Sequence, residues 1–231
     1  MFIIEGNIGA GKSTFLQTIQ KKMPALDVVF EPVHQWHKQG TGHSLLAEFY
    51  KDPQRWAYTL ETFAMVCRVQ EHLKEQENPN LMRIMERSIF SGHYCFAKND
   101  YVNGYMTELE WQVYQQWFDF LLNKKCKLPQ GFIYLRTEPT VAHARIAKRA
   151  RTGEDAISLD YITQIHERHE EFLMHRKGLA PKIAAVPVLV LDGNDAIEDK
   201  EYASKLIQKV HTFMQNIVSL QPQMQLRENS L

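Results

Sequence analysis

The sequence predicts a three-layer α/β fold, in which a five-stranded parallel sheet carries helices on both faces. Five short apolar segments recur along the chain, and helical patterns separate them. Strands that alternate with helices are typical of crossover connections and of a parallel sheet. The glycine-rich segment GNIGAGKST, 6–14, lies between the first apolar segment and the first helical pattern, as a phosphate-binding turn does.

The first half of the chain begins with the apolar segment FIIE at 2–5, which has the length of a strand. DVVF and LMRIME have the same character, and they predict strands at 27–30 and 81–86. Between and after these strands, longer patterns bounded by Gly, Pro, Asp, Asn, Ser or Thr indicate helices. These helices are expected at 11–23, 44–50, 54–77 and 91–99.

The second half repeats this alternation. GFIYLR and VPVLVL predict strands at 131–136 and 186–191. The expected helices are 107–123, 139–150, 158–176 and 195–216. Because no linker separates the strands, we expect a single domain over 1–218. The segment 219–231 shows no clear period, and we expect a frayed C-terminal tail.

Composition excludes several classes of protein. The 231 residues are 44% hydrophobic and 23% charged, as in ordinary globular proteins, and 27 basic residues balance 27 acidic ones. Without a broad basic field, a nucleic-acid polymer is not expected as a partner. Cys67, Cys95 and Cys126 lie far apart, which favours neither a disulfide framework nor a zinc site.

These features favour a reducing cytoplasm. The first motif begins within six residues, which leaves no room for a targeting peptide ahead of it. No apolar run approaches the roughly 18 residues that a spanning helix needs, so no membrane association is expected.

The glycine-rich segment has the full pattern Gly6-x-x-x-x-Gly11-Lys12-Ser13. Its glycines free backbone N–H groups to surround a phosphate, and the following helix adds its dipole. Lys12 would neutralise charge, and the Ser13 hydroxyl could bind Mg²⁺. The residues expected to hold a nucleotide phosphate are Gly6, Asn7, Ile8, Gly9, Ala10, Gly11, Lys12, Ser13 and Thr14.

Two further strand patterns end in charged residues. Glu31 follows the strand at 27–30, where a carboxylate could accept the proton of a hydroxyl nucleophile. Glu86 and Arg87 end the strand at 81–86, where Glu86 could serve a metal and Arg87 an oxygen of a substrate. The alternatives are a solvated Glu31 and an ordinary buried ion pair of Glu86 with Arg87.

The segment RIAKRARTGE, 145–154, is rich in basic residues. Arg145 and Arg149 lie one helical turn apart, and Lys148 and Arg151 are close by. Such a run is usually a solvated helix face. Beside a phosphate loop it predicts a basic lid that covers the phosphates and excludes water.

Together these segments resemble the deoxyribonucleoside kinase family, and most closely its deoxycytidine and deoxyguanosine kinase branch. The resemblance covers residues 1 to about 215 and rests on GNIGAGKST, FEP, FYKDPQRWAYT, ERSIFSGHY, TELEWQVYQQWFDF, FIYLRTEP and RIAKRARTGE, in that order. It implies a P-loop kinase fold with a basic lid. It also implies transfer of the γ-phosphoryl group of ATP or another nucleoside triphosphate, with Mg²⁺, to the 5′-hydroxyl of a deoxyribonucleoside.

The resemblance assigns roles to individual positions. The general base falls on Glu31, and Glu86 and Arg87 fall near Mg²⁺ and the 5′-hydroxyl. The groups that hold the sugar 3′-hydroxyl fall on Tyr50 and Glu154. The lid arginines that stabilise transferred charge are Arg145, Arg149 and Arg151. The apolar positions around base and sugar are Trp36, Leu46 and Phe96, whose alternative is plain core packing.

Two positions depart from the family pattern, and a third position near them keeps it. Glu61 stands where the family has a Gln that reads the base edge, Arg68 is retained, and Gly92 replaces an Asp. On a helix, Glu61 and Arg68 fall on one face, so that Glu61 could offset the missing Asp. An ionised Glu only accepts hydrogen bonds, which suits the two adjacent donors of guanine.

We therefore hypothesise a preference for guanine nucleosides. A protonated Glu61 would instead mimic Gln, and a Glu61 that only pairs with Arg68 would read no base. At the C-terminal end, Asp195-Ala196-Ile197 lacks the aromatic residue that often holds the donor base in the family. The choice of donor therefore stays open.

Alternative functions share parts of this pattern. A nucleoside monophosphate kinase of the thymidylate type has the same loop and a basic lid, but must also bind a phosphate on the acceptor. A non-catalytic subunit of the same fold usually loses catalytic residues, which are present here. A GTPase switch lacks support because no N-K-x-D motif occurs. The aromatic-rich helix at 107–122 resembles one that, with the helix at 54–77, pairs two subunits, so a homodimer is expected.

Overall fold

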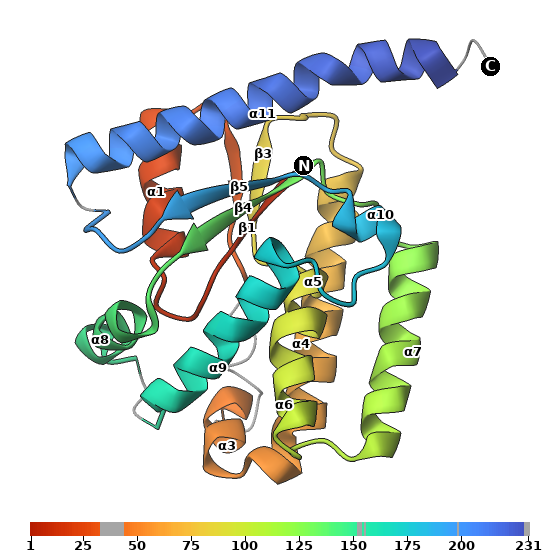
Figure 1. Cartoon of the computed structure of the whole chain (residues 1–231), viewed down its shortest axis with the longest axis vertical. Coiled ribbons are helices and arrows are strands. Elements are labelled where there is room, and N and C mark those ends of the chain that lie inside the picture. Colours follow the sequence, from red (N-terminus) through yellow and green to blue (C-terminus); the bar gives the residue numbers. More distant parts are fainter. Residues whose placement is uncertain (33–43, 152–153, 155, 198, 229–231) are drawn as a thin grey trace.

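The computed structural model describes the backbone of residues 1–32, 44–151, 154, 156–197 and 199–228, with side chains as far as residue 220. A parallel five-stranded sheet lies at its centre (Figure 1). Its strands stand in the order β2-β3-β1-β4-β5. They are β1 (Phe2–Glu5), β2 (Asp27–Val29), β3 (Arg83–Glu86), β4 (Gly131–Arg136) and β5 (Val188–Asp192). The predicted fold class is confirmed.

Helices connect the strands and follow the last one. The α-helices are α1 (Lys12–Lys22), α3 (Leu45–Lys51), α4 (Pro53–Gln76), α5 (Ile89–Ser91), α6 (Lys98–Val102), α7 (Glu108–Lys124), α8 (Pro139–Arg149), α9 (Leu159–His169), α10 (Pro181–Ala184) and α11 (Lys200–Glu228). Two π-helical segments, η1 (Gly92–Ala97) and η2 (Glu170–Met174), join α5 to α6 and extend α9. No helix in the described chain is both long and apolar enough to cross a membrane.

Local sequence explains why several helices begin where they do. Ser44, Asp52 and Ser158 each accept a hydrogen bond from the first turn of α3, α4 and α9. Thr107 and Glu110 form a reciprocal capping box at the start of α7. These caps satisfy N–H groups that would otherwise lack partners.

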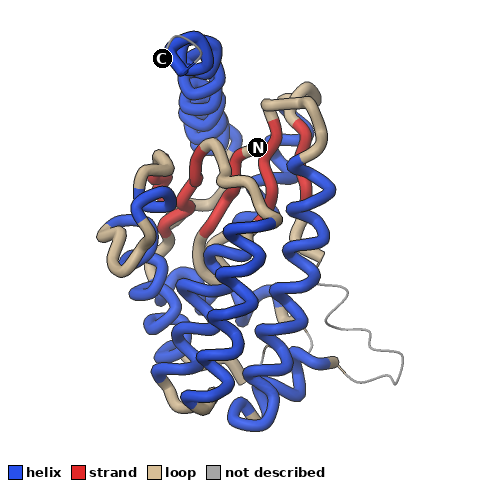
Figure 2. The backbone as a smooth tube through the Cα atoms, turned by 90° about the vertical axis from the view of Figure 1, so that its right-hand side faces the viewer, coloured by secondary structure: helices blue, strands red, loops and turns tan. Residues whose placement is uncertain are grey.

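Helices lie on both faces of the sheet (Figures 1 and 2), and a separate hydrophobic core lies on each face. Alternate β-strand residues face opposite sides, so that Ile3 and Phe132 join one core while Ile4 and Ile133 join the other. Helices α1 and α11 cover the second side. The first side is larger and is covered by α4, by the helices from α5 to α7 and by α9.

Some predicted boundaries were wrong, for identifiable reasons. The apolar run at 186–191 yields a strand only from Val188, because Pro187 has no N–H to donate to a ladder. The helix expected from 195 begins at Lys200, because Asp199 accepts from Glu201 N at 2.9 Å and Tyr202 N at 2.8 Å. It continues to Glu228, past the predicted end at 216 and into the segment expected to be frayed.

Candidate active site

The parallel strands bring their carboxyl ends to one edge of the sheet, where the candidate site lies. Ile4 of β1 pairs with Glu86 of β3 on one side and with Ile133 of β4 on the other. A cavity of about 400 Å³ opens at this edge, between the phosphate loop and helices α3, α4, α8 and α9. The predicted site residues that line it are Ile8, Gly9, Gly11, Lys12, Ser13, Thr14, Glu31, Leu46, Tyr50, Glu61, Arg68, Glu86, Arg87, Phe96, Arg149, Arg151 and Glu154.

The phosphate loop turns sharply from β1 into α1. Gly6, Gly9 and Gly11 have φ angles of 150°, 74° and 95°, which side chains rarely adopt. Lys12 is buried, and its ammonium donates to the carbonyls of Gly6 at 3.0 Å and Asn7 at 2.9 Å. Burial lowers the pKa of Lys12 to about 7. A bound phosphate would offer this amine a charged partner in place of two neutral carbonyls.

Ser13 and Glu86 meet across the mouth of the loop. The Ser13 hydroxyl donates to Oε1 of Glu86 at 2.7 Å, although 73 residues separate the two in sequence. A hydroxyl and a carboxylate are oxygen donors of the kind that Mg²⁺ prefers. The pair therefore fits the predicted metal site.

Glu31 lies between two guanidinium groups. Its Oε1 accepts from Arg68 Nε at 3.0 Å and pairs with Nη2 at 2.9 Å, and its Oε2 accepts from Arg87 Nε at 3.2 Å. Burial would raise the pKa of Glu31, but Arg68, Arg87 and Lys12 together outweigh burial and lower it. Glu31 is therefore an ionised and oriented carboxylate.

The backbone of Arg87 is strained. Its φ of 63° is left-handed, which costs a non-glycine residue roughly 1–2 kcal/mol. The Arg87 amide donates to the Ile4 carbonyl at 2.9 Å, and its guanidinium lies 4.7 Å from the ring centre of Phe96. Strain of this kind persists where the surroundings hold it, and it is common at active sites.

Glu61 lines the cavity from α4. It is 5% exposed, and its Oε2 has no hydrogen-bond partner within the described part of the chain. Burial, opposed by Arg68, raises the pKa of Glu61 to about 7. Arg68 forms an ion pair with Glu31, and its charge also acts on the carboxyl of Glu61.

Gly92 is explained by the same guanidinium. A Cβ atom at Gly92 would lie 2.7 Å from Nη1 of Arg68, so any side chain there would collide with Arg68 in its present position. Gly92 itself does not line the cavity. The absence of the family's Asp thus leaves room for the arginine that holds Glu31.

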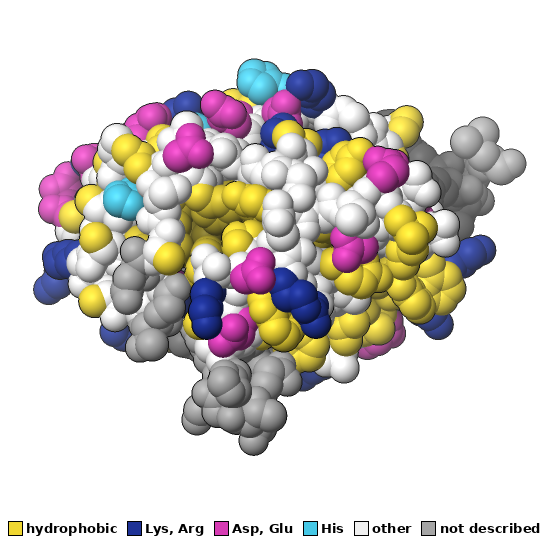
Figure 3. All heavy atoms as spheres, turned by 90° about the horizontal axis from the view of Figure 1, so that it is seen from below, with side chains coloured by type: hydrophobic (Ala, Val, Ile, Leu, Met, Phe, Trp, Pro, Cys, Tyr) yellow, Lys and Arg dark blue, Asp and Glu magenta, His cyan; other side chains and the backbone are white. Residues whose placement is uncertain are grey.

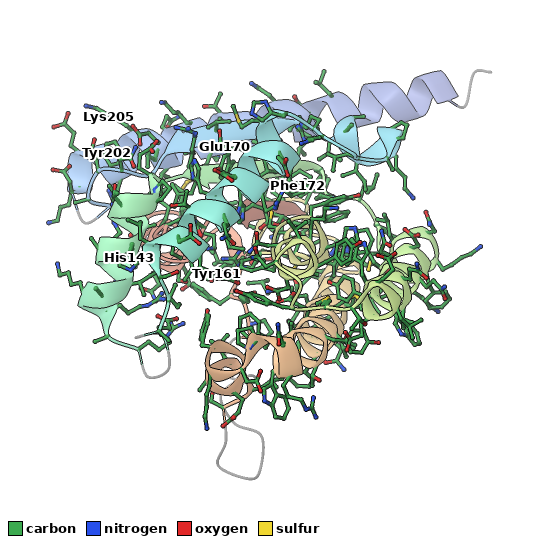
Figure 4. The ribbon with its side chains drawn as sticks, turned by 60° about the horizontal axis from the view of Figure 1, so that its bottom comes forward. His143, Tyr161, Glu170, Phe172, Tyr202 and Lys205 are labelled. Atoms are coloured by element: carbon green, nitrogen blue, oxygen red, sulfur yellow. The ribbon has the colours of Figure 1, made fainter. Side chains whose placement is uncertain are left out.

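The cavity wall opposite the loop contains Tyr50, Tyr161 and Glu154. The ring of Tyr161 projects from the side of α9 that faces α3 and meets the ring of Tyr50 edge-on at 6.4 Å (Figure 4). Burial first, and then Glu154, raise the pKa of Tyr50, which keeps its hydroxyl protonated. A neutral hydroxyl beside a carboxylate can bind an alcohol by donating to it while the carboxylate accepts.

The predicted lid arginines are not equivalent. Arg149 Nε donates to Oε2 of Glu154 at 3.2 Å, and Arg151 Nη1 donates to its Oε1 at 3.4 Å. Arg145 lies outside the cavity. Its guanidinium donates to the carbonyls of Ala10, Gly193, Asn194 and Asp195 at 3.3, 2.7, 2.9 and 2.9 Å. Arg145 therefore ties α8 to the phosphate loop and to the turn after β5.

A second cavity of about 780 Å³ adjoins the outer side of the phosphate loop. Arg145 and Lys148 line it, together with residues of the turn after β5. Because Gly9, Gly11 and Thr14 border both cavities, a phosphate chain on the loop could extend from one into the other.

The remaining predicted positions have different outcomes. Gly6, Asn7 and Ala10 belong to the loop without lining the first cavity, and Trp36 lies outside the described residues. The cavity is also lined by residues that were not among the predicted site residues, namely Gln17, Phe30, Phe49, Leu60, Ala64 and Tyr161. Helical spacing could have found Gln17, which lies one turn after Ser13. Nothing in the local sequence marks Tyr161, because α9 approaches α3 only in the folded chain.

Asp100 was also missed. It is fully buried in α6, and neither carboxyl oxygen has a hydrogen-bond partner among the residues described. Burial first, and then the proximity of Glu61, raise its pKa well above the usual value. Asp100 is therefore a second buried carboxyl near Glu61, although it does not line the cavity itself.

Comparison with known proteins gives a consistent picture. A family model described as deoxynucleoside kinase matches residues 2–215. Deoxycytidine kinase from Homo sapiens is 36% identical in an alignment of 239 positions, which covers 93% of this chain and 90% of the relative. Deoxycytidine kinase 2 from Gallus gallus is 35% identical over 91% of this chain and 89% of its own. Human mitochondrial thymidine kinase 2 is 37% identical over 84% and 71%.

Proposed function

The chain belongs to the deoxynucleoside kinase family and is a nucleoside kinase, and we propose on that premise that it phosphorylates the 5′-hydroxyl of a deoxyribonucleoside. Membership of a kinase family implies a nucleotide as phosphoryl donor. One observation carries the proposal: a single cavity is lined by the phosphate loop, by an ionised Glu31, and by the Tyr50 hydroxyl with the Glu154 carboxylate. Nucleotide salvage would be the role of such an enzyme.

Glu31 serves as the general base in this proposal. A nucleoside whose sugar contacts Tyr50 and Glu154 would direct its 5′-hydroxyl toward Glu31 and the phosphate loop. Phosphoryl transfer has a loose transition state, so that the base must accept the proton only late in the reaction. A carboxylate whose pKa is lowered by Arg68 and Arg87 suits that task, because it is ionised before the hydroxyl arrives.

The cations around the loop would stabilise the transferred group. Lys12 and Arg87 lie at the loop end of the cavity, and Arg149 and Arg151 line its rim. In this structure Arg149 and Arg151 form ion pairs with Glu154. A bound phosphate could replace Glu154 as their partner. Preorganised positive charge at this position lowers the barrier to transfer.

Ser13 and Glu86 would hold Mg²⁺ in the same complex. Bound there, the ion would supply positive charge to the oxygens of the donor phosphates. ATP or another triphosphate would extend into the second cavity, where Arg145 fixes the carbonyls of Asn194 and Asp195. Of these residues, Asn194 lines the second cavity, which would place it near the donor.

Glu61 supports a preference for guanine nucleosides. The relatives are named for deoxycytidine and thymidine, and the family's usual Gln at this position can both donate and accept. An ionised Glu61 accepts only, which matches N1–H and the 2-amino group of guanine. A base that presents an acceptor to this carboxylate would leave a buried mismatch that costs on the order of 1–3 kcal/mol.

A homodimer through α4 and α7 is part of the proposal. Hydrophobic side chains gather at the right-hand side of Figure 3, on the side where α7 lies in Figure 1. Trp117 and Phe120 of α7 are 51% and 48% exposed, and Val66 of α4 is also exposed. Large apolar groups gathered on one face are typical of a protein interface. The cytoplasmic location favoured by the cysteine pattern stays a prediction.

A substrate panel tests the proposed activity. The four deoxynucleosides, their ribo counterparts and their monophosphates should be assayed in parallel with ATP and Mg²⁺. We expect phosphorylation of at least one deoxynucleoside, and Glu31→Gln should lower its kcat by on the order of 10²-fold with modest loss of nucleoside binding. Activity on monophosphates alone would identify a monophosphate kinase, and near wild-type turnover of Glu31→Gln would remove Glu31 from the mechanism.

A further inference from the structure

We propose that Glu5 is a positioning residue that couples the phosphate loop to the turn carrying Glu86 and Arg87. Glu5 is the last residue of β1 and directly precedes Gly6 of the loop. It is fully buried at the end of an otherwise apolar strand. The inference rests on the proposed kinase function, because it concerns the alignment of that reaction's groups.

A carboxyl at this position is costly unless something requires it. Burying a polar group destabilises the folded chain unless hydrogen bonds replace those that the group makes with water. Oε2 of Glu5 has no hydrogen-bond partner within the described chain, and no ion pair is formed by Glu5 there. Oε1 accepts the hydroxyl hydrogen of Ser88, 83 residues away in sequence. That contact links the end of β1 to the turn that follows β3, and Ser91 of the same turn also acts on the Glu5 carboxyl.

Ser88 follows Arg87 and begins α5. Its Oγ accepts from the amides of Phe90 at 3.0 Å and Ser91 at 3.4 Å. A hydroxyl has one hydrogen to donate and two lone pairs. With Glu5 as the acceptor of that hydrogen, all three are used. The hydroxyl therefore cannot rotate, and the start of α5 is held in one orientation relative to β1.

The same part of β1 also holds the residue before Ser88. The Ile4 carbonyl accepts from the amide of Arg87 at 2.9 Å. Two neighbouring residues of β1, Ile4 and Glu5, thus hold two neighbouring residues of the turn, Arg87 and Ser88. The strained residue of the site, Arg87 with φ of 63°, is fixed on both sides by these contacts.

A protonated, uncharged carboxyl suits Glu5 to this role. Arg87 uses its Nε for Glu31, and an ionised Glu5 nearby would compete with Glu31 for that guanidinium. Burial raises the pKa of Glu5 against the opposing effect of Arg87. Because the contact with Ser88 needs only an acceptor oxygen, an amide in place of the carboxyl should preserve it.

Two variants separate positioning from packing. Glu5→Gln keeps an acceptor oxygen for Ser88, whereas Glu5→Met keeps a similar volume and has no such oxygen. We expect Glu5→Gln to stay within about threefold of the wild-type kcat. Glu5→Met should lower kcat by roughly 10- to 100-fold and change the KM of each substrate less. The reason is that a misalignment of Glu86 and Arg87 weakens mainly the stabilisation of the transition state.

Ser88→Ala removes the same contact from the other side, together with the acceptor of the Phe90 and Ser91 amides, and it provides the test if Glu5→Met does not fold. It should reduce kcat like Glu5→Met, and the double variant should be no worse than the more impaired single one. Equal losses in Glu5→Gln and Glu5→Met, additive losses in the double variant, or unchanged kcat in Glu5→Met or Ser88→Ala would overturn the proposal.

Amide hydrogen exchange gives a readout that does not depend on activity. Exchange at Arg87, Phe90 and Ser91 should be faster in Glu5→Met than in Glu5→Gln, and equal protection in the two would contradict the coupling. If the wild-type protein phosphorylates no nucleoside, the proposed function is wrong. The exchange rates of Glu5→Met and Glu5→Gln would still show whether Glu5 holds the turn at Ser88. An active wild type with unchanged variants would reject the positioning role alone.

Discussion

Glu31 and Glu61 line the same cavity, yet burial affects their carboxyl groups with opposite outcomes. Arg68 and Arg87 both contact Glu31, and the pKa of that carboxyl is lowered. Glu61 has no such contact in the described structure, and burial raises its pKa to about 7. Glu31, which we propose as the general base, is therefore ionised at neutral pH, whereas Glu61, which we propose to contact the nucleobase, has a pKa of about 7.

This difference predicts that base preference depends on pH. Below about pH 7, Glu61 is protonated and offers a donor and an acceptor, as Gln does. Above that pH it is ionised and accepts only. The ratio of kcat/KM for deoxyguanosine over deoxycytidine should therefore rise about fivefold or more from pH 6 to pH 8, since a buried mismatch costs roughly 1–3 kcal/mol.

Glu61→Gln should flatten this pH dependence and favour deoxycytidine at both values. Glu138→Gln, at a half-exposed glutamate outside the cavity, is the matched control and should leave the slope unchanged. Steady-state kinetics at six pH values would measure the ratio. A wild-type ratio that does not change with pH, or a slope that persists in Glu61→Gln, would show that Glu61 does not read the base.

Among elements, the phosphate loop was predictable because its pattern encodes backbone chemistry directly. Gly6-x-x-x-x-Gly11-Lys12-Ser13 requires left-handed or extended positive φ angles at glycines and a helix start at Lys12, and the structure has both. Strand and helix ends were harder. They depended on single groups such as the missing N–H of Pro187 and the cap at Asp199.

Gly6→Ala should damage this element. A Cβ at Gly6 would lie 2.6 Å from the carbonyl oxygen of Leu135 in β4, a backbone atom that cannot move aside easily, and φ is 150°. Gly6→Ala should lower the free energy of unfolding by about 1–3 kcal/mol more than the same substitution at a glycine that has no such neighbour. Affinity for ATP should fall at least tenfold as the loop leaves its position.

Gly104→Ala is the matched control, because Gly104 also has a positive φ, 73°, but nothing lies within 4 Å of its would-be Cβ. It should lose only about 1 kcal/mol and retain ATP binding. Urea unfolding and titration calorimetry would compare the two. Equal effects would mean that the contact with β4 does not constrain the loop.

At the scale of the whole molecule, the exposed aromatic surface of α7 predicts self-association. A double variant that carries Trp117→Glu and Phe120→Glu should raise the dimer dissociation constant by about 30-fold or more, since a central aromatic residue contributes roughly 2 kcal/mol or more to an interface. Sedimentation at micromolar concentration would show a dimer for the wild type and a monomer for this variant.

Leu220→Glu is the control for this experiment. Leu220 lies on α11, on the other side of the sheet, and is 51% exposed, the same fraction as Trp117. Its substitution should leave the dimer intact. A wild-type monomer, or equal dissociation in the two variants, would contradict an interface on α7.

The amino-acid sequence by itself determined the fold class, the phosphate loop and most of the residues that line the cavity. These features depend on local spacing and on the rule that parallel strands end at one edge, which places Glu31 and Glu86 near the loop. A carboxylate in the apolar strand at 2–5 was also visible, although only its contact with Ser88 gave it a meaning.

Only the tertiary structure decided which charge meets which. Arg68 pairs with Glu31, 37 residues away, and Arg145 binds four backbone carbonyls. Tyr161 reaches the cavity because α9 packs beside α3. The physical reason is that burial and ion pairing depend on distances across the fold. Local patterns specify the element on which a side chain lies, whereas packing specifies its neighbours and so its pKa and its role.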